Sequence, residues 1–121
     1  MGPRRHRCDL IVFNIPQVRR FLQEKREVFT WRQSNRPTGR QLAIGMRVGR
    51  LGIVIVHRLP KHKPEQYAHY FNRSGFDSWP DWRREAERVH KDSIETLRLY
   101  YVHFEGEANC TMDNCRQIVS G

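Results

Sequence analysis

The chain has 121 residues, and with 38% hydrophobic and 11% aromatic residues it is long enough to fold as one domain around a modest core. This composition excludes an intrinsically disordered chain, and no apolar run approaches the roughly 20 residues of a membrane-spanning helix. The formal net charge of +9 at pH 7 excludes an acidic protein whose surface would repel phosphate groups.

The basic residues are concentrated in the first half of the sequence. Residues 1–63 contain fifteen Lys and Arg against three Asp and Glu, a net charge of +12, whereas residues 64–121 contain seven against ten, a net charge of −3. A one-sided positive field of this kind is typical of proteins that bind a phosphate backbone. The alternative interpretation is a basic surface that only keeps the protein soluble.

The first predicted elements are a strand and a helix that follow a basic arm at residues 1–7. Residues 8–13 form a short apolar run that indicates a buried strand. Asn14 can cap the next helix, with Gln17 in the capping-box position. The apolar residues of this helix share one face, and the helix is expected to end near residue 25.

The second predicted strand, Val28–Gln33, is rich in β-branched and aromatic residues. Because side chains alternate along a strand, Phe29 and Trp31 point to one side, and Thr30 and Arg32 point to the other. We interpret Trp31 as a core residue, with base stacking as the alternative.

Three glycines divide the segment that follows a polar loop at residues 34–40. We predict two strands here, Met46–Leu51 and Ile53–Arg58, joined by a tight turn. Glycines at this density are typical of bulges or barrel corners.

The second half of the chain predicts two helices and a last strand. A short helix is expected at residues 65–71, and Ser78, with Asp81 three residues later, predicts the capped start of a second helix. Residues 97–104 alternate between two largely apolar faces and predict a strand buried on both sides.

These elements predict an α+β fold built on a small β-barrel of about five strands, with two or three flanking helices. The βαβ spacing of a doubly wound sheet is absent. We assign residues 8–106 to this domain and residues 107–121, which show no periodicity, to a C-terminal tail.

The three cysteines, Cys8, Cys110 and Cys115, are too few for a disulfide framework. A zinc site needs closer pairing and a fourth ligand, so we expect free thiols and no metal or other cofactor. The basic N-terminus does not lead into a secretory apolar region, and a cytoplasmic location is therefore expected.

Taken in order, several motifs make the sequence resemble the ASCH domain of the PUA-like superfamily. The motifs are Val28–Arg32, Ile44–Gly49, Val54–Pro60, Ser74–Ser78 and Leu99–Glu105. Among them, Ile44–Gly49 is similar to the family's hydrophobic-Gly-Asp-x-Val step into the barrel, and Ser74–Ser78 is similar to its Glu-Gly-Phe turn. The likeness covers about residues 8–106 and rests on the order of the whole set.

The resemblance implies a small β-barrel with helices around a cleft, and an association with RNA. One branch of the family hydrolyses the acetyl group of N4-acetylcytidine. Other members are described as ribonucleases or as RNA binders.

The resemblance also implies candidate catalytic residues, because the amidohydrolase branch uses a Lys, a Thr three residues later and a Glu before the Gly-Phe turn. Alignment on Arg32 puts Thr30 at the Thr position, but Glu27 at the Lys position and Lys25 at the preceding Gly position. Two of the three catalytic groups are therefore replaced. With a shifted register, Glu27 can act as a base and Lys25 can supply positive charge.

Eight basic side chains are the predicted RNA-binding residues, since the family fold would place many of them along one side of the cleft. They are Arg26, Arg32, Arg36, Arg40, Arg47, Arg50, Lys61 and Lys63. Arginine suits phosphate oxygens and stacks on bases, which favours RNA over a generic acidic partner.

The sequence thus predicts a small domain that binds RNA, single-stranded or containing a modified base, in a basic cleft, with no membrane partner. One alternative is a hydrolase of RNA or nucleosides, either an amidohydrolase or a ribonuclease that uses two of His57, His62 and His69. Another is a protein-interaction module whose acidic second half contacts a basic partner.

Overall fold

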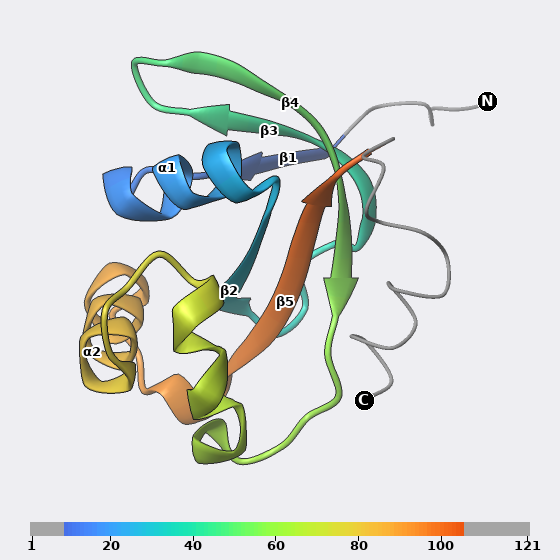
Figure 1. Ribbon diagram of the computed structural model, residues 1–121. Coiled ribbons are helices and arrows are strands. Elements are labelled where there is room, and N and C mark those ends of the chain that lie inside the picture. Colours follow the sequence, from blue (N-terminus) through green and yellow to red (C-terminus); the bar gives the residue numbers. More distant parts are fainter. Residues whose placement is uncertain (1–8, 106–121) are drawn as a thin grey trace, which may run out of the picture.

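A five-stranded sheet curled into a half-barrel forms the centre of the computed structural model, which describes residues 9–105 (Figure 1). In chain order the elements are β1 (Asp9–Val12), α1 (Pro16–Lys25), β2 (Glu27–Gln33), β3 (Gly39–Gly45), β4 (Gly49–Arg58), the 3-10 helix η1 (Pro64–Arg73), α2 (Trp79–His90), the short 3-10 helix η2 (Ile94–Thr96) and β5 (Leu97–Phe104). The predicted basic arm, the C-terminal tail and all three cysteines lie outside the described residues.

The sheet has the strand order β1-β3-β4-β5-β2. The short strand β1 runs parallel to β3, and every other neighbouring pair is antiparallel. Within residues 9–105, β1 and β2 are the two edges and do not pair with each other, so the sheet stops short of a closed barrel. The predicted α+β class with five strands and flanking helices is confirmed at this level.

The helices lie on both sides of β2 (Figure 1). Helix α1 lies between the β3–β4 hairpin and α2, and it contributes Val18 and Leu22 to the core. On the other side, Tyr70 of η1 stacks on Phe29 with 4.4 Å between ring centres. None of the helices in this part of the chain is long and apolar enough to cross a membrane.

Trp31 is the centre of an aromatic cluster between β2, η1 and α2. Its ring lies 5.8 Å from that of Trp82, 6.2 Å from that of Trp79 and 6.3 Å from that of Tyr67. Trp31 is only 4% exposed. The interpretation of Trp31 as a core residue is therefore confirmed, and these aromatic contacts hold α2 against the sheet.

The β3–β4 hairpin differs from its prediction. The strand predicted at residues 46–51 is wrong, because β3 ends at Gly45, the turn occupies residues 46–48 and β4 runs on from Gly49. Gly52 lies inside β4, with a φ of 141°, and a β-carbon there would lie 2.9 Å from the Phe104 ring. Gly52 therefore permits close packing of β4 on β5 instead of making a turn. A register shift between Ala43 and Ile44 is the kind of bulge that the glycine pattern predicted.

The two predicted helix caps have different outcomes. Ser78 caps α2 as expected, and its side-chain oxygen accepts a hydrogen bond from the Asp81 amide at 3.2 Å. The Asn14 cap is wrong, because Ile15 is the N-cap of α1 and makes no side-chain cap. The side-chain oxygen of Asn14 instead accepts a hydrogen bond from the Met46 amide at 3.1 Å.

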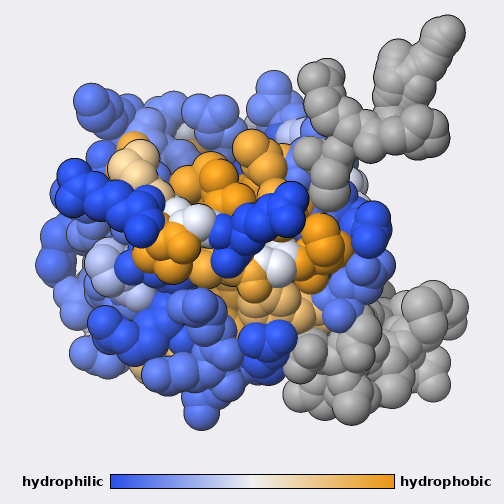
Figure 2. Space-filling view, turned by 90° about the horizontal axis from the view of Figure 1, so that it is seen from above, coloured by the Kyte–Doolittle hydropathy of each residue, from blue (hydrophilic) through white to orange (hydrophobic). Residues whose placement is uncertain are grey.

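Aliphatic side chains gather on the outer surface of β1, β3 and β4, between hydrophilic ones (Figure 2, seen from above). Leu10, Leu42 and Ile53 are register neighbours across the three strands, and Leu10 is 52% exposed. No element within residues 9–105 covers this surface. We call it the outer aliphatic face.

Candidate functional site

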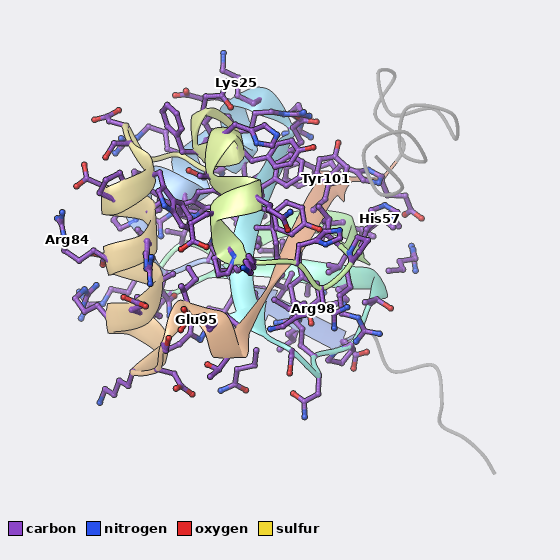
Figure 3. All side chains as sticks on the ribbon, turned by 90° about the horizontal axis from the view of Figure 1, so that it is seen from below. Lys25, His57, Arg84, Glu95, Arg98 and Tyr101 are labelled. Atoms are coloured by element: carbon purple, nitrogen blue, oxygen red, sulfur yellow. The ribbon has the colours of Figure 1, made fainter. Side chains whose placement is uncertain are left out.

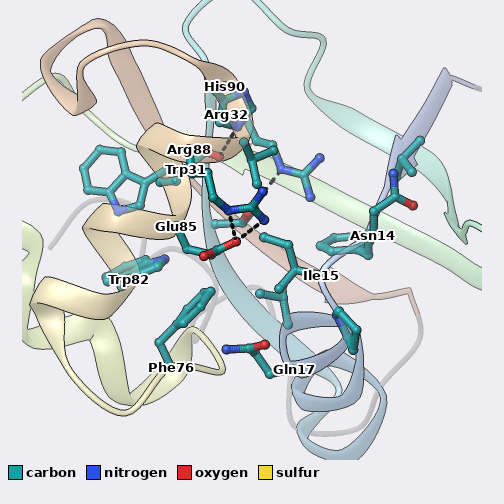
Figure 4. Close-up of a pocket in the computed structure, with 17 residues that line it drawn as sticks. Asn14, Ile15, Gln17, Trp31, Arg32, Phe76, Trp82, Glu85, Arg88 and His90 are labelled. Carbon is teal, nitrogen blue, oxygen red and sulfur yellow. Dashed lines mark hydrogen bonds and ion pairs between the residues drawn. The ribbon is translucent and has the colours of Figure 1, made fainter.

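A cleft of about 460 Å³ lies at the open seam between the two edge strands (Figure 4). One wall is the end of β1 with the loop into α1, and the other is β2 with α2. The residues that line it are Val12, Phe13, Asn14, Ile15, Pro16, Gln17, Val18, Thr30, Trp31, Arg32, Phe76, Trp82, Glu85, Ala86, Arg88, Val89 and His90. The cleft therefore touches both edge strands of the sheet.

Arg32 is the central polar residue of the cleft and reaches into it from β2 (Figure 4). Its Nε donates a hydrogen bond to the Thr30 hydroxyl at 3.1 Å, and its guanidinium carbon lies 4.8 Å from the centre of the Phe13 ring. No carboxylate within residues 9–105 pairs with it. The guanidinium therefore carries an uncompensated positive charge.

Burial is the main reason that the pKa of Arg32 falls to about 9, and the positive charge of Arg36 lowers it further. A group with this pKa remains protonated at pH 7. Because Arg32 is half-buried and has less water around it than a surface side chain, an anion that enters the cleft gains more from Arg32 than from an exposed arginine.

Arg36 connects the β2–β3 loop with β1 and β3. Its Nη2 donates hydrogen bonds to the Leu10 carbonyl at 3.1 Å and to the side-chain oxygen of Gln41 at 2.6 Å. Gln41 is fully buried and donates in turn to the Pro37 carbonyl at 2.8 Å. Arg36 thus ties the β2–β3 loop to the free edge of β1.

The α2 wall offers polar groups that are already engaged. His90 Nε2 lies 3.0 Å from the Trp31 carbonyl, which requires the proton on Nε2 and leaves Nδ1 as an acceptor in the neutral ring. Burial is the main cause that lowers the pKa of His90; the hydrogen bond to Trp31 opposes this, and the charge of Arg32 lowers the pKa further. Glu85 accepts a hydrogen bond from Arg88 Nε at 2.7 Å, so its charge is compensated. With His90 neutral, the charged groups lining the cleft sum to a net positive charge.

The remaining surface of the cleft is largely apolar and aromatic. Phe13, Trp82 and Phe76 are buried rings that line it. A concave site with apolar walls and a few polar groups is the usual form of a small-molecule pocket.

The structure does not bring the three candidate catalytic residues together. Thr30 lines the cleft and is 7% exposed. Glu27 lies on the opposite face of β2, where Arg73 Nε at 2.8 Å and the Tyr101 hydroxyl at 2.6 Å donate to its carboxylate. Lys25 extends into solvent at the end of α1 (Figure 3). Neither Glu27 nor Lys25 lines the cleft.

Of the eight predicted RNA-binding residues, Arg32 alone lines the cleft. Arg40 pairs with Glu105 at 3.0 Å, and Lys61 Nζ donates to the Glu95 carbonyl at 2.7 Å. The structure therefore does not gather all these side chains around one concavity.

The other predicted basic residues lie elsewhere on the surface. The Arg26 guanidinium lies 3.9 Å from the centre of the Phe104 ring. Lys63 is exposed at the start of η1, and Arg47 and Arg50 are exposed at the tip of the β3–β4 hairpin.

Sequence reasoning missed five polar residues of the cleft, which are Asn14, Gln17, Glu85, Arg88 and His90. A signal for the α2 residues was present, because Glu85 and His90 are each next in sequence to a residue of the apolar stripe, Ala86 or Val89. A residue beside the buried stripe of a helix lies at the boundary of whatever that stripe covers.

The histidines do not form a ribonuclease-like pair in the cleft. His57 instead pairs with His103, and their Nε2 atoms lie 2.9 Å apart beside Tyr101, outside the cleft (Figure 3). Within the described residues, no group of three or more His, Cys, Asp or Glu side chains could hold a metal ion.

Comparison with protein-family models, with characterised proteins and with solved structures found no match to this chain. The resemblance to the ASCH domain therefore stays a prediction, and the functional argument rests on the geometry of the cleft.

Proposed function

We propose that this protein binds RNA by taking one nucleotide of it, with an ordinary or a modified base, into the cleft at the open seam. The observation that carries the proposal is the Arg32 guanidinium, which lies inside the cleft with no carboxylate beside it among residues 9–105. A phosphate group or an electron-rich base edge is the chemistry that such a group recognises.

The size and walls of the cleft support a nucleotide as the ligand. A volume of about 460 Å³ lies within the usual range for small-molecule sites, roughly 300 to 1,000 Å³. Ile15, Pro16 and Val89 line the cleft with apolar side chains that are at least partly exposed, and these provide apolar surface for a flat base. His90 Nδ1 is an acceptor, and the Asn14 side-chain amide is a donor, so both kinds of polar group are available to a base edge.

The polar geometry favours binding over hydrolysis. The carboxylate that lines the cleft, Glu85, is paired with Arg88. His90 uses its Nε2 on the Trp31 carbonyl, and Glu27 faces away from Thr30. Among the described residues, no group beside Thr30 is therefore arranged to activate it as a nucleophile.

The first prediction is that Arg32→Gln weakens RNA binding by about tenfold or more, since it removes the uncompensated charge. The measurement is fluorescence anisotropy with a labelled single-stranded RNA at about 50 and about 200 mM salt, because phosphate binding weakens steeply with salt. Arg84→Gln is the matched control, because Arg84 is exposed on α2, pairs with Asp81 and points away from the cleft (Figure 3).

Two results would contradict the proposal. Wild-type affinity that ignores salt would mean that phosphate is not recognised. Turnover of N4-acetylcytidine or of labelled RNA by the wild-type protein, abolished in Thr30→Ala, would replace it with the hydrolase alternative.

A further inference from the structure

We infer that the tip of the β3–β4 hairpin, residues 46–50, is a second RNA contact, and that the ligand is therefore a polynucleotide strand and not a free nucleotide. This inference rests on the proposed function of the cleft. The tip would bind the part of the strand next to the nucleotide that enters the cleft.

The hairpin tip is fixed at the rim of the cleft. The Met46 amide donates to the Asn14 side chain at 3.1 Å, and the Phe13 amide donates to the Ile44 carbonyl at 2.8 Å. Asn14 and Phe13 both line the cleft. A strand that leaves the cleft over this wall meets the hairpin tip first.

The uncompensated positive charge of the rim is on the hairpin side. Arg47 and Arg50 are exposed at the tip. Arg19 lies directly below, since a β-carbon on Gly45 would be 2.8 Å from its Cδ, and its Nη1 donates to the Phe13 carbonyl at 3.3 Å. None of these three arginines pairs with a carboxylate within residues 9–105.

Helix α2 is different, because its arginines are neutralised by carboxylates. Arg83 pairs with Glu65 and Glu87, Arg84 pairs with Asp81, and Arg88 pairs with Glu85. The arginines beside the hairpin and those of α2 are thus similar in number but opposite in their state of compensation. A phosphate backbone gains the most binding free energy where the arginines are unpaired, which is beside the hairpin tip.

The tip also carries apolar side chains that remain exposed in the part of the chain that the structure describes. Met46 is 63% exposed and Val48 is 51% exposed (the tip lies on the face seen in Figure 2). Arg47 between them has a φ of 68°, a left-handed conformation that is unfavourable for arginine. When one nucleotide leaves its stack to enter the cleft, the neighbouring bases lose a stacking surface. Aliphatic side chains beside basic ones are suited to cover that surface.

The test compares two ligands and three proteins. The ligands are a mixture of the four nucleoside 5′-monophosphates and a labelled single-stranded RNA of about ten nucleotides, long enough to reach beyond one pocket. The proteins are the wild type, the double variant Arg47→Gln with Arg50→Gln, and a control double variant on α2, Arg83→Gln with Arg84→Gln. Each variant also has its thermal unfolding midpoint measured, to confirm the fold.

We expect the hairpin variant to bind the monophosphates like the wild type but the RNA about tenfold more weakly at low salt. The plot of log affinity against log salt should become shallower by about 0.7 for each phosphate that the variant no longer neutralises. The α2 control should keep wild-type values for both ligands, because its arginines are already paired.

The outcomes separate the two proposals. If the wild type binds RNA and the hairpin variant binds it equally well with the same salt slope, the hairpin inference is wrong and the cleft proposal stands. If both variants weaken RNA binding equally, general surface charge is responsible and the inference is also wrong. If the wild type binds neither ligand, both proposals are wrong.

Discussion

His57 shows how a single side chain links the fold to pH. Its Nε2 lies 2.9 Å from that of His103, whose Nδ1 lies 3.1 Å from the Phe104 carbonyl. In the neutral pair, His103 therefore donates through Nδ1, and His57 donates its Nε2 proton to His103. Burial, followed by the charge of His103, lowers the pKa of His57 below 6.5.

This geometry predicts that the protein becomes less stable as the pH falls below about 6.5. Because the pKa of His57 is lower in the folded than in the unfolded state, the unfolded chain takes up a proton first on acidification, and the free energy of unfolding decreases. Urea denaturation at several pH values between about 7 and about 5 measures the effect. His57→Gln should flatten this part of the curve, and an unchanged slope in that variant would assign the effect to another group.

At the residue scale, the sequence predicted the types of group in the cleft better than their positions. Thr30 and Arg32 were placed on one face of a strand by the alternation of β2, and they are in contact in the cleft. Glu27 was proposed to work with Thr30, although they are three positions apart and the same alternation puts them on opposite faces. His90 was missed, because its place next to the apolar stripe indicates only the boundary of a buried face and does not say that the end of α2 lies beside β2.

At the scale of elements, regular periodicity predicted β2, α2 and β5, whereas the glycine-rich hairpin was misplaced. Three glycines lie within eight residues there, and each is a possible turn. A contact distant in sequence determines which glycine is in the turn. Gly52 packs against Phe104 of β5 and is therefore part of β4. Local sequence cannot supply that information.

This contact predicts that Gly52→Ala destabilises the protein by about 2 kcal/mol or more, since it adds a clash with the Phe104 ring to an unfavourable φ. Gly49→Ala is the matched control, because Gly49 also has a positive φ of 91° but would have nothing within 4 Å of its β-carbon. The control should lose only about 1 kcal/mol, the cost of the backbone conformation. Chemical denaturation of both variants measures the difference. Equal losses in the free energy of unfolding would mean that the Phe104 ring moves aside without destabilising the protein.

At the scale of the whole molecule, the split in charge along the sequence becomes a difference between surfaces. The arginines of η1 and α2 pair with carboxylates, whereas in the first half Arg40 pairs with Glu105, and Arg19, Arg32, Arg47 and Arg50 have no acidic partner within residues 9–105. The sequence therefore predicted the excess of positive charge. It did not predict that Arg32 alone of the eight nominated residues would line the cleft, because that depends on how the sheet curls.

The outer aliphatic face gives a prediction at the same scale. Leu10 is 52% exposed there, so Leu10→Lys should change the free energy of unfolding by less than about 0.5 kcal/mol. The same change should lower the binding of a hydrophobic dye to the native protein, because it places a charge on the apolar surface. Dye fluorescence and urea denaturation measure the two effects. A large loss of stability would mean that Leu10 is covered in the complete chain.

The open edge of β1 has a consequence for the local opening of the cleft. β1 has four residues, one hydrogen-bonded neighbour and a parallel pairing that joins Asp9 to Gln41 across a long stretch of chain. Contacts of this kind form late in folding and open early in the native state, so amide protons in β1 should exchange with solvent before those of β5. Within residues 9–105 no strand joins β1 to β2, so a molecule that bridges these two edges would act as a further strand, and its binding would slow amide exchange in β1.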